Sequence, residues 1–121
     1  MDRVRWIEVK GQKILYSDYS NLKTVEEQLE VWRATVAVAK ENPGVNYPAI
    51  LNFTNTAGSA ELMEKMKQAI TDSGLGQPRK KAVIGIAGVK NVLLDGYVRA
   101  TGNKLIKACA DDAEAIEFVT S

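Results

Sequence analysis

The sequence contains no histidine and a single cysteine, Cys109, among its 121 residues. Without histidine, neither a Ser-His-Asp triad nor a Cys-His pair can form, and no imidazole can ligate a metal. One thiol cannot make an internal disulfide or a thiolate zinc site. The acid–base groups that remain are Asp, Glu, Lys, Arg and Tyr. We therefore expect a protein that is not an enzyme and that uses no cofactor and no metal.

An excess of charge of one sign is also lacking, since 16 basic residues stand against 15 acidic ones and the net charge is +1. This balance predicts no nucleic-acid partner. No apolar run approaches the roughly 18 residues that a membrane span needs. The first ten residues, MDRVRWIEVK, lack the apolar segment of a signal peptide. We expect a cytoplasmic protein with no membrane span.

Extended and helical patterns alternate along the chain. Strands are predicted over Val4–Val9, Lys13–Asp18, Ala49–Phe53, Lys81–Ala87 and Leu105–Ala108. Helices are predicted over Val25–Glu41, Ala60–Ser73, Val89–Thr101 and Asp111–Thr120. Only Lys10-Gly11-Gln12 separates the first two strands, which is too short for a crossover and predicts an antiparallel hairpin. The alternation that follows favours right-handed parallel crossovers, and so a single α/β domain over residues 1–121 with a mixed sheet in the order β-β-α-β-α-β-α-β-α.

Local patterns sharpen this prediction. Thr24 and Glu27 fit a capping box at the start of the first helix. The core stripe expected on that helix consists of Val25, Leu29, Trp32, Val36 and Ala39, widened by Val31 and Val38. The stripe expected on the last helix consists of Ala113, Ile116 and Val119. Charges on the first strand (Arg3, Arg5, Glu8 and Lys10) predict an edge position, and the apolar run KAVIGIA predicts an interior strand.

The strongest functional signal is the segment Ala49–Ser59, AILNFTNTAGS, where a buried strand gives way to small polar residues before a helix. Loops at the carboxyl ends of parallel strands are where ligands usually bind. A second corner of this kind holds Gly88 and Lys90, whose backbone N–H groups and cation suit an anion. The residues that we expect at this edge for a ligand or anion are Asp18, Asn52, Thr54, Gly88 and Lys90, with Thr56 and Ser59 beside them.

Three segments carry a resemblance to a known family: KGQKILYSDYSNLK (Lys10–Lys23), PAILNFTNTAGS (Pro48–Ser59) and KAVIGIAGVKNVLL (Lys81–Leu94). With the order of elements, they make the chain resemble the STAS domain, and more narrowly the bacterial SpoIIAA-like group. The wider superfamily also contains CRAL-TRIO lipid-binding domains. The resemblance implies a STAS-like fold and a regulatory role, in which a serine that begins the helix after the third strand is phosphorylated. Ser59 is the best positional match and Thr56 the second. The Asp-Ser pair of the family's phosphorylated motif is absent here.

Several functions remain open on the sequence alone. The first is a non-enzymatic regulatory or protein-interaction module, with a protein partner or self-association through the hairpin edge. The second is a carrier for a small anionic or lipid-like ligand. An enzyme that relies on Asp18 and Lys90 ranks last, since a lone carboxylate has no placed acid–base partner. Two roles remain open for Ser59: a simple helix cap or a regulated hydroxyl.

Overall fold

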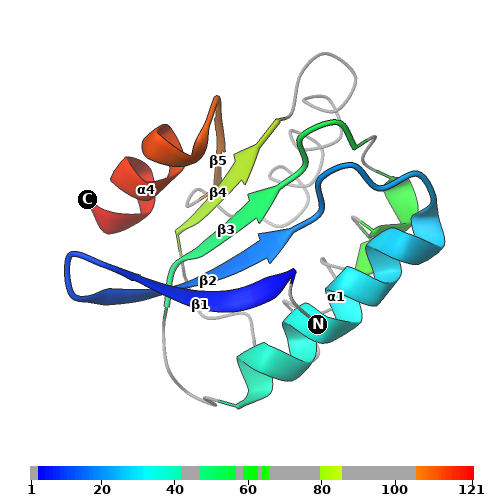
Figure 1. The fold of residues 1–121 in the computed structure, drawn as a ribbon, viewed down its shortest axis with the longest axis horizontal. Helices are drawn as coiled ribbons and strands as arrows, with labels where there is room; N and C mark the ends of the chain where they lie inside the picture. The colour runs from blue at the N-terminus through cyan, green and yellow to red at the C-terminus, as the bar shows by residue number, and fades with distance from the viewer. Residues whose placement is uncertain (1–2, 42–46, 57–58, 63, 66–79, 86–105) are drawn as a thin grey trace.

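The computed structural model describes residues 3–41, 47–56, 59–62, 64–65, 80–85 and 106–121. Its five strands form one mixed sheet in the order β1-β2-β3-β4-β5 (Figure 1). The strands are β1 (Val4–Val9), β2 (Gln12–Asp18), β3 (Ala49–Asn52), β4 (Lys81–Ile84) and β5 (Ile106–Cys109). β1 and β2 are antiparallel, and every later pair is parallel. The predicted α/β class, edge position of β1 and interior position of β4 are confirmed.

The turn between β1 and β2 is one residue shorter than predicted. Gln12 pairs with Val9 and belongs to β2, so Lys10 and Gly11 alone form the turn. Both take positive φ, 53° at Lys10 and 76° at Gly11. Two positive φ values in a two-residue loop are the pattern of a type I′ turn, whose twist matches that of the flanking strands.

The first helix, α1 (Val25–Lys40), begins with the predicted capping box. The Thr24 hydroxyl accepts a hydrogen bond from the Glu27 N–H at 3.1 Å, and the Glu27 carboxylate accepts one from the Thr24 N–H at 2.9 Å. The backbone N–H groups of Lys23 and Thr24 lower the pKa of Glu27. These contacts fix where α1 starts, and hence where the loop after β2 ends.

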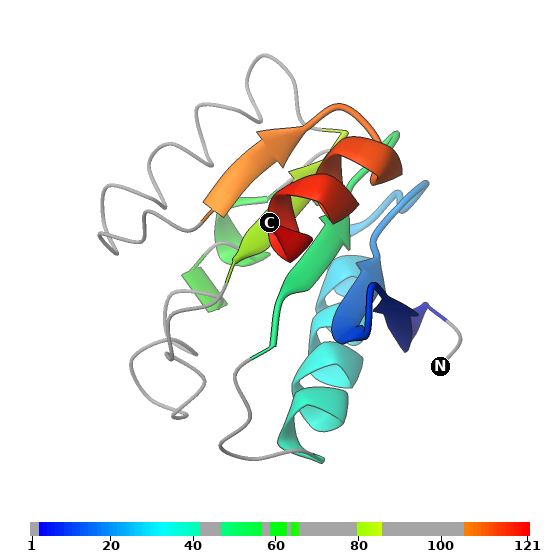
Figure 2. The ribbon, with the colours of Figure 1, turned by 90° about the vertical axis from the view of Figure 1, so that its left-hand side faces the viewer.

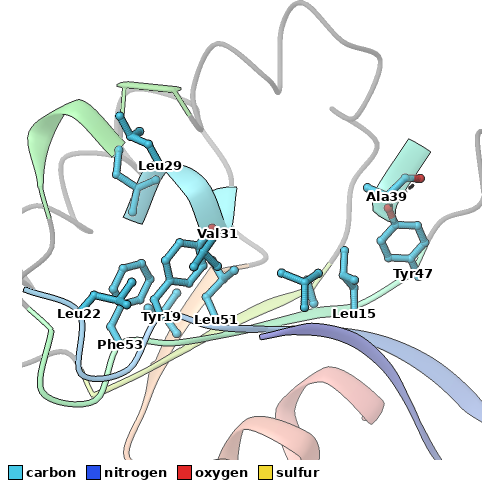
Figure 3. Close-up of a cluster of buried hydrophobic side chains, with 13 residues drawn as sticks. Leu15, Tyr19, Leu22, Leu29, Val31, Ala39, Tyr47, Leu51 and Phe53 are labelled. Atoms are coloured by element: carbon cyan, nitrogen blue, oxygen red, sulfur yellow. Dashed lines mark hydrogen bonds between the residues drawn. The ribbon is translucent and has the colours of Figure 1, made fainter. Parts of the chain in front are cut away.

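Helix α1 packs on one face of the sheet, over a core that includes the rings of Tyr19 and Phe53 (Figure 3). The Tyr19 and Phe53 rings stack with centroids 4.7 Å apart. Leu29, Val31 and Ala39 are buried as predicted, whereas Val25 is 38% exposed, so its place in the core stripe was wrong. Val25 lies in the first turn of α1, beyond the part that covers the sheet. Gln28 and Thr35 are buried instead.

The opposite face is covered by α4 (Asp112–Thr120), as Figures 1 and 2 show. Asp111 precedes the helix as its N-cap and accepts a hydrogen bond from the Glu114 N–H at 2.9 Å. This cap sets the rotation of a short helix, so that Ala115 and Val119 are buried. Ala113, which was predicted to be buried, is exposed. The core on this face is aliphatic and includes Ile14, Ile50, Ala82 and Ile84.

The remaining predicted helices lie wholly or mainly outside the described residues. Residues 60–62 and 64–65 are helical, in agreement with the start of the helix predicted from Ala60. The helix predicted over Val89–Thr101, together with Gly88 and Lys90, falls outside the described ranges. Among the described helices, none has the length and apolar character needed to cross a membrane.

Candidate functional site at the carboxyl edge of the sheet

Strands β2 and β3 run in parallel and end side by side, because Asp18 pairs in register with Asn52. Their following loops therefore leave the sheet at one edge, as predicted. Ser20, two residues beyond Asp18, donates its backbone N–H to the Asp18 carboxylate at 2.9 Å. This edge holds all five of the predicted site residues that the structure describes, and it is the candidate site.

Asn52 and Thr54 join a hydrogen-bonded chain on the α4 side of the sheet. The Tyr16 hydroxyl donates to the Asp112 carboxylate at 2.7 Å and accepts from the Asn52 amide at 3.0 Å. The Asn52 side-chain oxygen accepts from the Thr54 N–H at 3.0 Å and from the Thr54 hydroxyl at 2.6 Å. Burial, and then the hydrogen bond to Asp112, raises the pKa of Tyr16 to about 12. Tyr16 is therefore a neutral donor at neutral pH.

Charges of both signs lie on this side, since Arg3 and Arg5 lie near Asp18 and Asp112. Asp18 lies 3.8 Å from the Arg3 guanidinium, with both side chains about one-third exposed. Arg3 also donates to the backbone carbonyl oxygens of Asp18 and Ser20, at 3.2 and 2.9 Å. Asp18, Asn52 and Thr54 thus lie together as predicted, beside charged side chains of both signs. The groups predicted to attract one, at Gly88 and Lys90, lie outside the described residues.

Thr56 connects the loops after β2 and β3 from within. Thr56 is fully buried, and its hydroxyl donates to the Tyr19 carbonyl oxygen. The same hydroxyl accepts from the Leu22 N–H at 3.0 Å. One side chain in the β3 loop therefore satisfies two backbone groups in the β2 loop. Modification of Thr56 would require these contacts to open first.

A second set of contacts joins the same two loops at the surface. The Asn21 N–H donates to the Thr54 carbonyl oxygen at 2.9 Å, and the Asn55 amide donates to the Asn21 side-chain oxygen at 3.1 Å. Asn21 and Asn55 have φ of 58° and 56°. Asparagine tolerates this left-handed conformation better than other residues with a side chain. Both loops are thus held in defined conformations.

Gly85, the first residue after β4, brings a third loop into the same arrangement. Its φ is +81°, and a Cβ atom placed on it would lie 2.6 Å from the Thr54 backbone nitrogen. Only glycine allows this conformation and this close approach. We refer to residues 19–24, residues 53–56 and Gly85 together as the edge platform. It is built from the loops that follow three neighbouring strands.

Ser59 lies on the α1 side, away from the Asp18–Asn52–Thr54 group. Its hydroxyl accepts from the Leu62 N–H at 3.1 Å, so Ser59 caps the helical residues that follow, as predicted. The hydroxyl also donates to the Gln28 side-chain oxygen at 3.0 Å. Gln28 is 3% exposed, whereas Ser59 is partly exposed. The described residues of the expected ligand site are therefore divided between the two sides of the sheet.

No group of acidic, cysteine or histidine side chains in the described ranges could hold a metal ion. Cys109, the lone thiol, is buried at the end of β5. Burial raises the pKa of this thiol, and the charge of Glu114 adds to the shift. A raised pKa keeps the sulfur protonated and so a poor nucleophile.

Sequence reasoning missed four residues that organise this edge: Tyr16, Asn21, Gln28 and Gly85. Tyr16 and Gln28 act through side chains that only the folded packing brings to Asp112 and Ser59. Asn21 and Gly85 carried a usable signal, because asparagine and glycine in the loops that follow strands are common at positive φ.

Comparison of the chain with protein-family models, curated proteins and solved structures finds no match. What the chain does must therefore be argued from its own side chains.

Proposed function

We propose that the chain is a cytoplasmic, non-enzymatic regulatory or protein-interaction module of STAS-like fold, which binds a protein partner at the edge platform. One observation carries this proposal. The loops after β2, β3 and β4 are joined by hydrogen bonds and close packing into one surface at the carboxyl edge. A surface that is ordered before binding loses little conformational entropy on association.

The side chains that the platform exposes are polar and mostly uncharged. Five are exposed, and four of these five are uncharged: Asn21, Lys23, Thr24, Thr54 and Asn55. The backbone of these loops is fixed by buried groups, namely the Thr56 hydroxyl and the Tyr19–Phe53 stack. This arrangement suits a partner that recognises shape and hydrogen-bonding groups more than charge.

Ser59 gives the proposal a regulatory element, as the resemblance to STAS domains implies. The Ser59 hydroxyl now donates to the Gln28 oxygen. A phosphate ester in its place has acceptor oxygens and about −2 charge, so this contact could not persist unchanged. The Gln28 amide would have to rotate, or α1 would have to move relative to the platform. Phosphorylation of Ser59 would thereby change the surface that a partner meets.

Site-specific photo-crosslinking tests where a partner binds. A photoreactive residue is placed at Lys23 on the platform and, in a matched control, at Glu30 on the exposed side of α1. Both positions are exposed. Lys23 lies in the loop just before α1, and Glu30 lies within α1. We expect one protein to be captured from position 23 and not from position 30. Equal capture from both positions, or capture from position 30 alone, would contradict a partner site on the platform.

Mass spectrometry of gently purified protein, under native and under denaturing conditions, tests the regulatory element. Added mass of a phosphate that survives denaturation and maps to Ser59 supports it, and should disappear in Ser59→Ala. Phosphate that maps to Thr56 would show that the buried hydroxyl becomes accessible, against the geometry described above. An unmodified chain under all growth conditions would remove the regulatory element and leave the binding surface.

A carrier for a small lipid-like or anionic ligand is the second candidate, favoured by one observation. Tyr19 is fully buried, and no described residue meets its hydroxyl with hydrogen-bond geometry, although the Thr35 side chain is near enough to lower the pKa of Tyr19 against the effect of burial. Buried hydroxyls usually have a hydrogen-bond partner. A ligand between α1 and the sheet could supply it. Added mass seen only under native conditions, and lost in Tyr19→Phe, would support the carrier over the module.

A further inference from the structure

Strand β1 is the outermost strand of the sheet, and none of the described elements lies beyond it in Figure 2. The Arg3 carbonyl oxygen accepts from the Asp18 N–H, so the backbone groups of Arg3 point toward β2. In an antiparallel pair this direction alternates from residue to residue. The N–H and C=O groups of Val4, Trp6 and Glu8 therefore point away from β2, along an edge open to another strand.

The cations that were expected to protect this edge are turned toward the protein's own sheet. Arg3 donates to the carbonyl oxygens at the end of β2, and the Arg5 guanidinium lies 4.7 Å from the centroid of the Tyr16 ring. Lys10 reaches across to Glu117 and Thr120 of α4, at 3.4 and 3.3 Å. Charged side chains that project past an edge discourage strand addition. Here the three cations make contacts inside the chain instead.

We propose that β1 pairs antiparallel with β1 of a second copy of this chain, about a two-fold axis at Trp6. The contact lies outside the edge platform and does not depend on the function proposed for it. It turns two five-stranded sheets into one continuous sheet. It also leaves the two edge platforms facing opposite ways, so one dimer presents two binding surfaces.

Hydrogen bonding and charge select this register. Residues with outward groups must face each other, so only Val4, Trp6 and Glu8 can form the bonded pairs. If Val4 faced Trp6 of the partner, Arg5 would face Arg5. If Glu8 faced Glu8, two carboxylates would be opposed. Like charges directly opposite are destabilising.

Centring the axis on Trp6 avoids both conflicts. Trp6 then faces its own copy, and Val4 faces Glu8 in each of two equivalent pairs. Arg5 faces Ile7 on the other side of the sheet. An axis at Ile7 also avoids opposed charges, but it places Val4 opposite Lys10, in the hairpin turn. The Trp6 axis therefore keeps the most bonded pairs within β1.

Trp6 is suited to the centre of the contact. Its ring is partly buried and packs edge-on against Tyr47, with centroids 4.8 Å apart, so its orientation is set before association. Aromatic residues that face each other across strands stabilise a sheet. A net charge of +1 gives little repulsion between two copies.

Sedimentation velocity of the full chain over a concentration series tests the dimer, with Glu8→Pro as the disrupting variant. Proline at position 8 removes an N–H that points away from β2, and proline is tolerated on edge strands. We expect a wild-type dimer and association at least about tenfold weaker in Glu8→Pro, because each protomer loses a donor and gains a steric block. Glu8→Ala, which keeps the N–H, should still dimerise. A monomeric wild-type protein, or equal association of Glu8→Pro, would overturn the proposal.

Disulfide trapping tests the register independently of the proline variant. With Cys109 replaced by alanine, Trp6→Cys places two thiols at directly opposed residues about 5.5 Å apart between Cα atoms, within disulfide range. Glu8→Cys is the control, since its two copies would lie about 13 Å apart along the strands. We expect rapid oxidation to a covalent dimer for Trp6→Cys alone. Preferential linkage of Glu8→Cys, or no linkage of either, would contradict the Trp6 axis.

Discussion

The two faces of the sheet differ in the polar side chains that they bury: several lie under α1, whereas the core under α4 is mainly aliphatic. Under α1, the Ser17 and Thr35 hydroxyls lie 2.9 Å apart, with Gln28 and Thr56 also buried. Under α4, the core is mainly aliphatic but also contains Tyr16 and Cys109, and polar contacts lie at its margin. These marginal contacts join Tyr16 to Asp112, Lys10 to Glu117 and Lys80 to Ser121.

The difference separates two tasks between the two faces of one sheet. An aliphatic core is largely non-directional, so α4 needs contacts at its ends to fix its position. Buried hydroxyls and amides accept only a few arrangements, because an unpaired one is costly. The α1 face therefore fixes the loops after β2 and β3 in one conformation. The edge platform depends on that face more than on the other.

The largest expected effect comes from breaking the platform at Gly85. In Gly85→Ala the new Cβ would lie 2.6 Å from the Thr54 nitrogen, at a φ of +81°. We expect a loss of roughly 3 kcal/mol in the free energy of unfolding, from overpacking and left-handed strain together. Urea denaturation followed by far-UV circular dichroism measures it. A loss below about 1 kcal/mol would mean that the third loop is not held against the second.

Thr56→Val removes the polar link on the α1 face while it keeps the side-chain volume. The Leu22 N–H and the Tyr19 carbonyl oxygen would lose their partner, so we expect a loss of about 2–3 kcal/mol in the free energy of unfolding. Thr56→Ser retains the hydroxyl and is the matched control, with a smaller loss. If valine and serine were equally destabilising, packing rather than hydrogen bonding would explain the role of Thr56.

Tyr16→Phe is the corresponding change on the α4 face. Loss of the hydrogen bond to Asp112, at the margin of the core, should cost about 1 kcal/mol at neutral pH. The folded protein raises the pKa of Tyr16 from 10.0 to about 12. Its contribution is thus fully present below pH 10 and is lost as the pH rises from 10 to 12.

Thermal melts of both proteins at closely spaced pH values check this dependence. The stability difference between wild type and Tyr16→Phe should shrink from pH 10 to pH 12. Tyr19, whose pKa burial also raises, is present in both proteins, so its effect cancels in the difference. A difference that stays constant over this interval would show that Tyr16 titrates as in the unfolded chain.

The smallest effect is expected for Tyr19→Phe. The Tyr19 hydroxyl is buried without a hydrogen-bond partner among the described residues, and the ring stacks on Phe53 in either variant. Removal of an unpaired hydroxyl should change the free energy of unfolding by less than about 0.5 kcal/mol, or raise it. A loss above about 1 kcal/mol would show that this hydroxyl makes a stabilising hydrogen bond, as the Thr56 hydroxyl does.

Local signals were sufficient to predict much of this fold. The hairpin, the Thr24–Glu27 capping box and the strand β4 follow from turn residues, spacing and apolar runs. Val25 and Ala113 were misplaced, because hydrophobic spacing alone does not show where a helix leaves the sheet or how its cap rotates it.

The candidate site was predictable only in part. Parallel strands necessarily bring Asp18 and Asn52 to one edge, so that juxtaposition was foreseen. The burial of Thr56 and the contact of Ser59 with Gln28 were not, since they join residues more than 30 positions apart in the chain. A pattern of polar residues marks an edge, but it does not show to which side of the sheet each side chain turns.

Native-state hydrogen exchange, followed residue by residue by NMR, tests most directly whether the edge platform is ordered before any partner binds. The amides of Asn21, Leu22 and Thr56 donate within the platform, and that of Phe53 donates to β4. We predict that the three platform amides are protected nearly as well as Phe53, and that Thr56→Val lowers their protection together. Exchange of all three at the rate of an unstructured peptide, beside a protected Phe53, would contradict a preorganised platform.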